Sequence, residues 1–329
     1  MSQTSDAVNR DNGTGAQAES GTTVQPGTAA AGSAAASAAA MASTATGPRD
    51  RYAVIGNPIG HSKSPFIHAR FAEQTGEPIE YTHLLAPIDA FVPHVQAFIE
   101  AGGRGLNVTV PFKLEAHALA TRLSPRAAAA GAVNTLRFEA GEIHGDNTDG
   151  FGLVRDIEVN LATPLKGARI LLLGAGGAAR GVVLPMLERA PHTLTIVNRT
   201  AARAQELVSQ FGEAAQAAGC RLTGGSAAAI ESGAYDVIVN ATAGSLDAAL
   251  PECDDGAFGN GTLAYDMMYG AQPTVFMQHA QTLGARAADG LGMLVEQAAE
   301  SFYLWRGVRP DGAPVLAELR RMLAASSAA

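Results

Sequence analysis

The strongest constraint on the fold is a short apolar run followed directly by a cluster of glycines. Residues Arg169–Leu173 read RILLL, and Gly174-Ala175-Gly176-Gly177 then leads into a helical stretch over Ala178–Arg189. An apolar strand without alternation is typical of the centre of a parallel sheet, where helices bury both faces. Glycines between such a strand and a helix allow a tight turn and let the helix amino end bind phosphates. The segment therefore predicts a dinucleotide-binding unit, with a plain strand–helix turn as the alternative.

The pattern around this segment alternates strands with helices. Further strands are expected at Thr193–Val197, Asp236–Asn240 and Leu263–Asp266, and further helices at Gly150–Leu161 and Ala201–Phe211. This order predicts an α/β fold with a doubly wound parallel sheet.

A second unit precedes it in the chain. Strands are expected at Tyr52–Gly56, Tyr81–Leu85 and Gly105–Val108, helices at Phe66–Thr75, Phe91–Ala101 and Lys113–Thr121, and a hairpin at Thr135–Phe138 and Glu142–Gly145. This is a βαβ-rich unit with an antiparallel ending. Two helices, Gly292–Trp305 and Pro314–Ala325, end the chain, and periodicity does not say which unit they pack against.

The first 48 residues differ in composition from the rest. Residues 20–48 carry no charged side chain, and residues 29–40 are nine Ala, two Ser and one Gly. Such small side chains bury too little surface for a core or a membrane span, and no basic segment marks a signal peptide. We expect residues 1–48 to be a disordered, dispensable tail, with Met41 a candidate natural start.

Charge and cysteine content narrow the class of protein. The net charge is −8 without a long run of either sign, which argues against nucleic acid or an anionic membrane as the main partner. Cys220 and Cys253 fit no metal or redox spacing, which excludes a disulfide scaffold and fits a reducing cytoplasm. We expect a cytoplasmic protein with a small-molecule partner and no metal.

The residues that select the cofactor are expected at the end of the strand Thr193–Val197. NAD sites place an Asp or Glu there, but this chain has Asn198-Arg199-Thr200, with Arg203 one turn further on. A guanidinium binds a 2′-phosphate that a carboxylate would repel. The sequence therefore predicts NADP. The alternative is a helix cap at Thr200 with two solvated arginines.

Polar residues follow the strands of the first unit. Ser62 and Ser64 stand just before the helix that Pro65 opens, where they could bind a carboxylate or simply cap the helix. Lys113 opens a helix, against the macrodipole, and such breaches of local rules are more frequent at functional sites.

Three further polar residues flank the hairpin. Asn134 precedes its first strand, and Asp146 and Asp149 follow its second, where an Asx turn and helix cap are the alternative reading. Together with the serines and the lysine, they predict a substrate pocket without metal-ligand spacing.

These residues carry a close resemblance to the shikimate dehydrogenase family. The matching strings, in the family's order over nearly all of residues 52–305, are GNPIGHSKSP, NVTVPFK, GAVNT, GDNTDG, GAGGAAR, NRT, DMMYG and ADGLGMLVEQA. The resemblance implies an enzyme of aromatic amino-acid biosynthesis that reduces 3-dehydroshikimate to shikimate with NADPH. It implies a substrate domain over 49–150, a Rossmann-type NADP domain over 151–288, and C-terminal helices over 289–329 that return to the substrate domain.

The resemblance also implies individual roles. On the substrate side it assigns Ser62, Ser64, Thr109, Lys113, Asn134, Asp149, Tyr269 and Gln297. On the cofactor side it assigns Gly174, Ala175, Gly176, Gly177, Ala178, Asn198, Arg199, Thr200, Arg203, Met267 and Gly290.

Lys113 and Asp149 are the acid–base pair that the motifs offer. We expect Lys113 to be the general acid in reduction and the base in oxidation, with Asp149 orienting Lys113 and a substrate hydroxyl. The chain departs from the family pattern at Ala243-Gly244-Ser245, where two serines and a glycine are usual and where the loop to Pro251 looks short. Alternatives are a quinate/shikimate dehydrogenase of relaxed specificity and an NADP-binding regulator without turnover. Either a monomer or a homodimer is compatible with the sequence.

Overall fold

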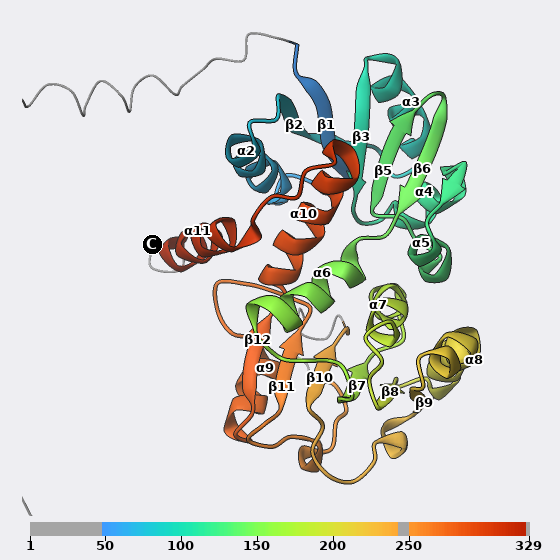
Figure 1. The fold of residues 1–329 in the computed structure, drawn as a ribbon, viewed down its shortest axis with the longest axis vertical. Helices are drawn as coiled ribbons and strands as arrows, with labels where there is room; N and C mark the ends of the chain where they lie inside the picture. The colour runs from blue at the N-terminus through green and yellow to red at the C-terminus, as the bar shows by residue number, and fades with distance from the viewer. Residues whose placement is uncertain (1–47, 243–249, 327–329) are drawn as a thin grey trace, which may run out of the picture. The chain divides into compact units, whose positions relative to one another are not determined.

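The computed structural model describes residues 48–242 and 250–326 of the chain. Within them lie two six-stranded sheets, each with helices packed against it (Figure 1). The expectations for the tail before residue 48 and for the loop Ala243-Gly244-Ser245 lie outside the described residues.

The first sheet is mixed. Its strands are β1 (Asp50–Gly56), β2 (Ile79–Leu85), β3 (Gly103–Val108), β4 (Arg122–Leu123), β5 (Thr135–Glu139) and β6 (Glu142–Asp146). Their order is β2-β1-β3-β5-β6-β4, in which β1 pairs parallel with β2 and β3 while β5 pairs antiparallel with β3 and β6. The predicted βαβ-rich unit with an antiparallel ending is confirmed. The sequence does not predict β4, a two-residue edge strand parallel to β6.

Helices cover both faces of this sheet. They are α2 (Ser64–Thr75), α3 (Phe91–Glu100), α4 (Lys113–Leu119) and α5 (Pro125–Ala130). Residues of α3, α4 and α5 share one apolar cluster with β1, β3 and β5, while α2 packs with β1 in another. The sequence does not predict α5, because PRAAAA has no apolar periodicity. Ser124 caps it by accepting a hydrogen bond from Ala127 N at 3.2 Å.

The second sheet is wholly parallel. Its strands are β7 (Arg169–Leu173), β8 (Thr193–Val197), β9 (Arg221–Gly225), β10 (Val237–Asn240), β11 (Leu263–Asp266) and β12 (Arg286–Asp289). They lie in the order β12-β11-β10-β7-β8-β9. The chain moves outward from β7 to β9 and then crosses to β10. The carboxyl ends of β7 and β10 therefore form the switch point at which such sheets bind ligands.

The helices of this sheet are α7 (Gly177–Leu187), α8 (Ala201–Ala217) and α9 (Val275–Thr282). The doubly wound sheet is confirmed, and the strand expected at Arg169–Leu173 lies where the apolar run predicts it. The helix that begins at Ala201 continues six residues beyond Phe211, because good helix formers follow the single Gly212.

The two sheets are joined by α6 (Asp149–Arg155), a π-helical turn η1 (Asp156–Asn160) and α10 (Leu291–Arg306), and α11 (Gly312–Ser326) follows. The helix expected over Gly150–Leu161 is thus interrupted at Asp156, which is buried and accepts hydrogen bonds from Tyr265 and Asn160. A Cβ on Gly152 would lie 2.6 Å from Met293 O, so only glycine allows α6 to approach α10 this closely.

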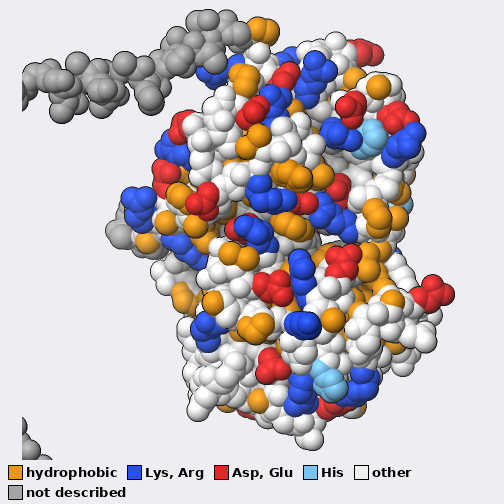
Figure 2. All heavy atoms as spheres, in the orientation of Figure 1, with side chains coloured by type: hydrophobic (Ala, Val, Ile, Leu, Met, Phe, Trp, Pro, Cys, Tyr) orange, Lys and Arg blue, Asp and Glu red, His pale blue; other side chains and the backbone are white. Residues whose placement is uncertain are grey.

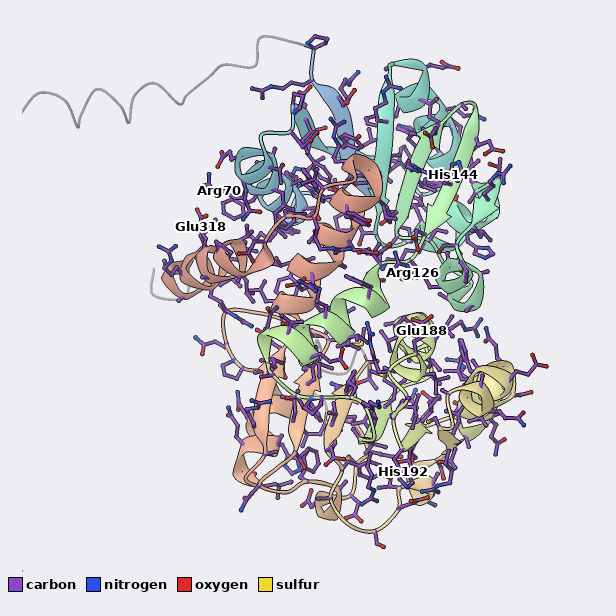
Figure 3. The ribbon with its side chains drawn as sticks, in the orientation of Figure 1. Arg70, Arg126, His144, Glu188, His192 and Glu318 are labelled. Atoms are coloured by element: carbon purple, nitrogen blue, oxygen red, sulfur yellow. The ribbon has the colours of Figure 1, made fainter. Side chains whose placement is uncertain are left out.

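The C-terminal helices pack against the first sheet's α2. Tyr52, Phe71, Phe302 and Leu319 share one buried cluster drawn from β1, α2, α10 and α11. Arg70 of α2 and Glu318 of α11 point toward each other, with 2.9 Å between Nη2 and Oε1 (Figure 3).

Acidic and basic side chains are intermingled on the face that Figure 2 shows. No helix in the described ranges combines the length and apolar character needed to cross a bilayer.

Candidate active site

A cavity of about 530 Å³ lies between the two sheets. It collects side chains from the carboxyl ends of β1 and β3, the amino ends of α2, α4 and α6, the turns after β11 and β12, and α10. All eight residues expected on the substrate side line it: Ser62, Ser64, Thr109, Lys113, Asn134, Asp149, Tyr269 and Gln297. Met267 and Gly290, expected on the cofactor side, line it too. Its size suits a small organic ligand.

Two charged side chains meet in this cavity. Lys113 Nζ lies 2.6 Å from Asp149 Oδ2, and the two side chains are 31% and 19% exposed. Each is the first residue of its helix, α4 and α6 respectively. The amino end of α6 favours the carboxylate, whereas that of α4 disfavours an ammonium group. Asp149 supplies the negative charge that offsets this conflict at Lys113.

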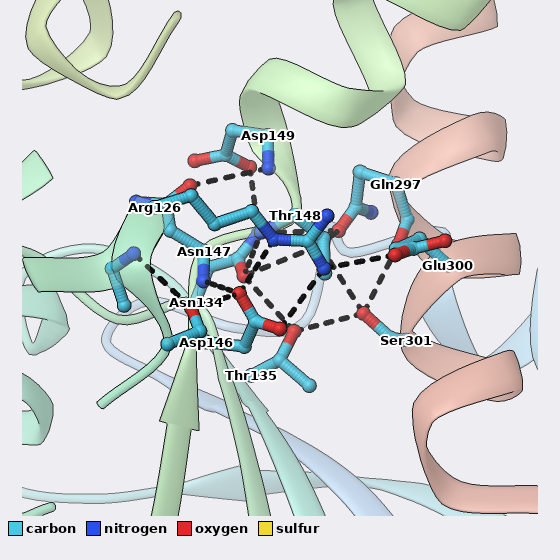
Figure 4. A network of polar contacts seen from close by, with 12 residues as sticks. Arg126, Asn134, Thr135, Asp146, Asn147, Thr148, Asp149, Gln297, Glu300 and Ser301 are labelled. Carbon is cyan, nitrogen blue, oxygen red and sulfur yellow. Dashed lines mark hydrogen bonds and ion pairs between the residues drawn. The ribbon is translucent and has the colours of Figure 1, made fainter. Parts of the chain in front are cut away.

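Asp149 is held from its other side by Asn134. Asn134 Nδ2 donates to Asp149 Oδ1 at 2.8 Å, and Asn134 Oδ1 accepts from the backbone N–H of Thr148 at 2.9 Å (Figure 4). Gln297 reaches the same group from α10, with Oε1 3.4 Å from Asn134 Nδ2. The carboxylate therefore has a fixed orientation toward Lys113.

The two serines stand at the amino end of α2. Ser64 is the first helical residue, only 6% exposed, and Ser62 Oγ accepts a hydrogen bond from Ser64 N at 3.3 Å. The contact between the two serines and ligand binding are compatible here, because both residues also line the cavity. The helix amino end adds a favourable field for an anionic group.

The glycine turn after β7 has the geometry of a phosphate site. Gly174 has a φ of +110°, and a Cβ there would lie 3.2 Å from the backbone of Ala241 after β10. A Cβ on Gly176 or Gly177 would meet no atom of the described residues within 4 Å, so those residues leave space over the amino end of α7. Gly176 caps α7 without a side-chain hydrogen bond, which leaves backbone N–H groups for a ligand.

The next turn carries the expected specificity residues. Asn198 Oδ1 accepts from Ala175 N at 3.2 Å and its Nδ2 donates to Thr200 O at 2.9 Å. Asn198 thereby ties the glycine turn to the start of α8. Arg199 is exposed beside it, and no carboxylate stands among residues 198–203. These features fit NADP, with its pyrophosphate at α7 and its 2′-phosphate at Arg199.

Met267 and Gly290 directly follow the paired strand ends Asp266 and Asp289. A Cβ on Gly290 would lie 2.2 Å from Met267 O, so this close approach requires glycine. Tyr269 follows on the same turn. Burial and the charge of Asp289 raise the pKa of its phenol, which keeps it a neutral hydrogen-bond donor.

Comparisons with known proteins agree with this geometry. The chain is 59% identical over 282 residues to the NADP-dependent shikimate dehydrogenase of Cupriavidus pinatubonensis, covering 84% of this chain and 96% of that one. It is 58% identical to the corresponding enzyme of Herminiimonas arsenicoxydans, with 83% and 98% covered. The chain belongs to the shikimate dehydrogenase family.

Three domain models of the shikimate dehydrogenase family account for successive parts of the chain. The substrate binding domain model matches residues 54–136, the shikimate / quinate 5-dehydrogenase model 157–248, and the shikimate 5'-dehydrogenase C-terminal domain model 290–320.

Solved structures show the same fold. Shikimate 5-dehydrogenase of Thermus thermophilus, in complex with NADP(H) and shikimate, is 32% identical with a TM-score of 0.71, covering 83% of this chain and 99% of that one. The Ael1 enzyme of Pseudomonas putida is 48% identical with a TM-score of 0.78, covering 82% and 98%.

Three further residues line the cavity, although the sequence motifs that contain them did not indicate a role for them. Asn107 lines the cavity, is 6% exposed, and accepts a hydrogen bond from Tyr81 OH at 2.7 Å. An asparagine between the buried Leu106 and Val108 of β3 was the available signal. His61 and Lys63 also line the cavity. Among residues 48–242 and 250–326, no cluster of His, Cys, Asp and Glu side chains could hold a metal ion.

Proposed function

We propose that this chain catalyses the reversible, NADPH-dependent reduction of 3-dehydroshikimate to shikimate in aromatic amino-acid (chorismate) biosynthesis. The observation that carries the proposal is the 2.6 Å pair of Lys113 and Asp149 inside a cavity shared by the serines of α2 and the Met267–Gly290 turn. Such a reaction needs an acid–base pair, a helix amino end that binds an anion, and a turn that contacts the nicotinamide.

The substrate carboxylate binds at the amino end of α2. Ser62 and Ser64 supply hydroxyls there, and Tyr269 supplies a neutral phenol from the turn after β11. This arrangement sets the orientation of the ring, because hydrogen bonds to a carboxylate are among the stronger ones in proteins.

Lys113 transfers the proton. NADPH, when bound, supplies the hydride that reduces the ketone. Lys113 Nζ donates a proton to the oxygen that becomes the hydroxyl group, and takes it back in the reverse reaction. Asp149 orients Lys113 and accepts a hydrogen bond from a neighbouring substrate hydroxyl, while Thr109, Asn134 and Gln297 contribute to binding the remaining hydroxyl.

NADP is held by the second sheet. Gly174–Ala178 bind the pyrophosphate at the start of α7, and Asn198, Arg199, Thr200 and Arg203 bind the adenosine 2′-phosphate end. Met267 and Gly290 bind the nicotinamide end beside the substrate. The free thiols of Cys220 and Cys253 support a cytoplasmic location, and the protein acts as a monomer or homodimer.

The test is steady-state oxidation of shikimate and quinate, each with NADP and with NAD. We expect the highest kcat/KM for shikimate with NADP. Comparable values for quinate would favour a quinate/shikimate dehydrogenase of relaxed specificity, to which one matching domain model also extends by name. No turnover of either substrate, with NADP still bound, would favour a regulator and overturn the proposal.

A further inference from the structure

The hydrogen bonds behind the cavity converge on one buried hydroxyl, that of Thr135. Thr135 is the first residue of β5, follows Asn134 directly and is 1% exposed. Its Oγ1 donates to Asn134 Oδ1 at 2.9 Å and accepts from Asn107 Nδ2 at 3.2 Å. Thr135 thus contacts both asparagines of the cavity without lining that cavity itself.

The Thr135 hydroxyl also connects Asn134 to a serine of α10. A hydroxyl has one hydrogen, and Thr135 gives its own to Asn134 Oδ1, which can only accept. Ser301 Oγ lies 2.8 Å from Thr135 Oγ1 and also donates to the backbone oxygen of Gln297 at 3.0 Å. Ser301 belongs to α10 and is fully buried. The resulting chain of contacts runs from Ser301 through Thr135 to Asn134 (Figure 4).

This chain selects one of two orientations of the Asn134 amide. In the observed orientation, Nδ2 donates to Asp149 Oδ1 at 2.8 Å. A flipped amide would place Oδ1 against that carboxylate. The Thr135 hydroxyl and the Thr148 backbone N–H both donate to Oδ1 and so stabilise the observed orientation. Donation to the amide oxygen also polarises the amide N–H and strengthens its bond to Asp149.

We propose that Thr135 and Ser301 are positioning residues of the active site. Neither touches the substrate. They fix the Asn134 amide, which holds Asp149 in the orientation that presents Oδ2 to Lys113. This inference rests on the proposed function, because it assigns the two hydroxyls a part in the acid–base step of that reaction.

The test is Thr135→Val, which keeps the side-chain shape and removes the hydroxyl. Asn107 Nδ2 keeps Ser301 Oγ at 3.0 Å, and Ser301 Oγ keeps Gln297 O at 3.0 Å, so no neighbour is left without a partner. We expect kcat for shikimate oxidation to fall roughly tenfold, the effect of about 1.4 kcal/mol, with the KM for NADP unchanged. Ser301→Ala should lower kcat in the same direction.

Three further variants distinguish a positioning role of Thr135 from an effect on the stability of the protein. Thr135→Ser keeps the hydroxyl and should retain most of kcat. Thr193→Val is a matched control in β8 and should leave kcat unchanged, because Thr193 is 2% exposed and its Oγ1 has no hydrogen-bond partner among the described residues. In an Asn134→Ala background, Thr135→Val should cause no further loss, because both act through one amide.

Wild-type kcat in Thr135→Val would overturn the inference and leave the proposed function standing. Three other results would overturn the inference too. The first is a tenfold loss of kcat in both Thr135→Val and Thr135→Ser, and the second is a full further loss when Thr135→Val is added to Asn134→Ala. The third is the same loss in Thr193→Val. A wild-type protein that does not oxidise shikimate would overturn the proposed function first, and the inference with it.

Discussion

His68 is an imidazole enclosed by aromatic rings. It is fully buried, stacks on Tyr81 with 4.1 Å between ring centroids, and lies near Phe71, Phe302 and Trp305. Burial lowers its pKa to about 3, and the nearby Asn107 side chain opposes this shift only in part. Within the described part of the chain, neither ring nitrogen has a neighbour in good hydrogen-bond geometry.

This burial makes stability depend on pH. Between pH about 6.5 and about 3 the unfolded chain binds a proton at His68 and the native chain does not, so stability is lost as the pH falls through that window. The loss approaches about 1.4 kcal/mol per pH unit. His68→Phe should flatten this part of the dependence of Tm on pH. His192→Gln, at an exposed position, is the control for losing an imidazole. An unchanged slope in His68→Phe would assign the acid sensitivity to other groups.

The paired serines of α2 can be tested directly. Replacing Ser62 and Ser64 by Ala should raise the KM for shikimate by roughly 10²-fold, as expected for the loss of two hydrogen bonds to a charged group. The KM for NADP should stay the same. Ser124→Ala, which removes the cap of α5 away from the cavity, should lower Tm alone. If the double serine variant behaves like Ser124→Ala, the serines are caps and do not bind the substrate.

At the scale of elements, we propose that the turn between β8 and α8 selects NADP over NAD. Arg199→Ala should weaken NADP binding by about 1.5–3 kcal/mol, the scale of a charge-assisted hydrogen bond, and hardly change NAD binding. Arg189→Ala, at an exposed arginine beyond the far end of α7, is the control and should affect neither cofactor. Equal losses for NAD and NADP would show that Arg199 does not contact the 2′-phosphate.

Elements with a strong local signal were predictable from the sequence, and weakly marked ones were not. β7 reads RILLL and is found at its predicted bounds, whereas β12 reads RAAD and becomes a strand only because it pairs with β11. Likewise β9 ends in two glycines, which have low strand propensity. The strand that a segment pairs with can lie far away in the sequence, so a local sequence pattern does not predict such a strand.

The same distinction holds in the site. Polar residues at strand ends and helix starts, such as Lys113 and Asp149, were recognisable from their positions alone. Thr135 and Ser301 were not, because a threonine in a strand and a serine in a helix are ordinary residues. Only the packing of α10 against β5 brings their hydroxyls to 2.8 Å from each other.

At the scale of the whole molecule, the described residues that line the cavity all follow Pro48 in the chain. The alignment with the relative from Cupriavidus pinatubonensis takes in 96% of that protein but only 84% of this chain. A chain beginning at Met41 should therefore match the full chain in kcat, KM and Tm. Lower activity or a Tm several degrees lower in the shortened chain would show that the first forty residues contribute to the folded enzyme.

The central claim is that Lys113 moves the proton in this reaction. Its most direct test is kcat for shikimate oxidation in Lys113→Ala, with Lys166→Ala at an exposed lysine as the control. Loss of a general acid–base group predicts a kcat lower by roughly 10²–10⁴, with a smaller change in KM and an unchanged Tm. The control should retain wild-type kcat. A Lys113→Ala enzyme that turns over at the wild-type rate would contradict the account.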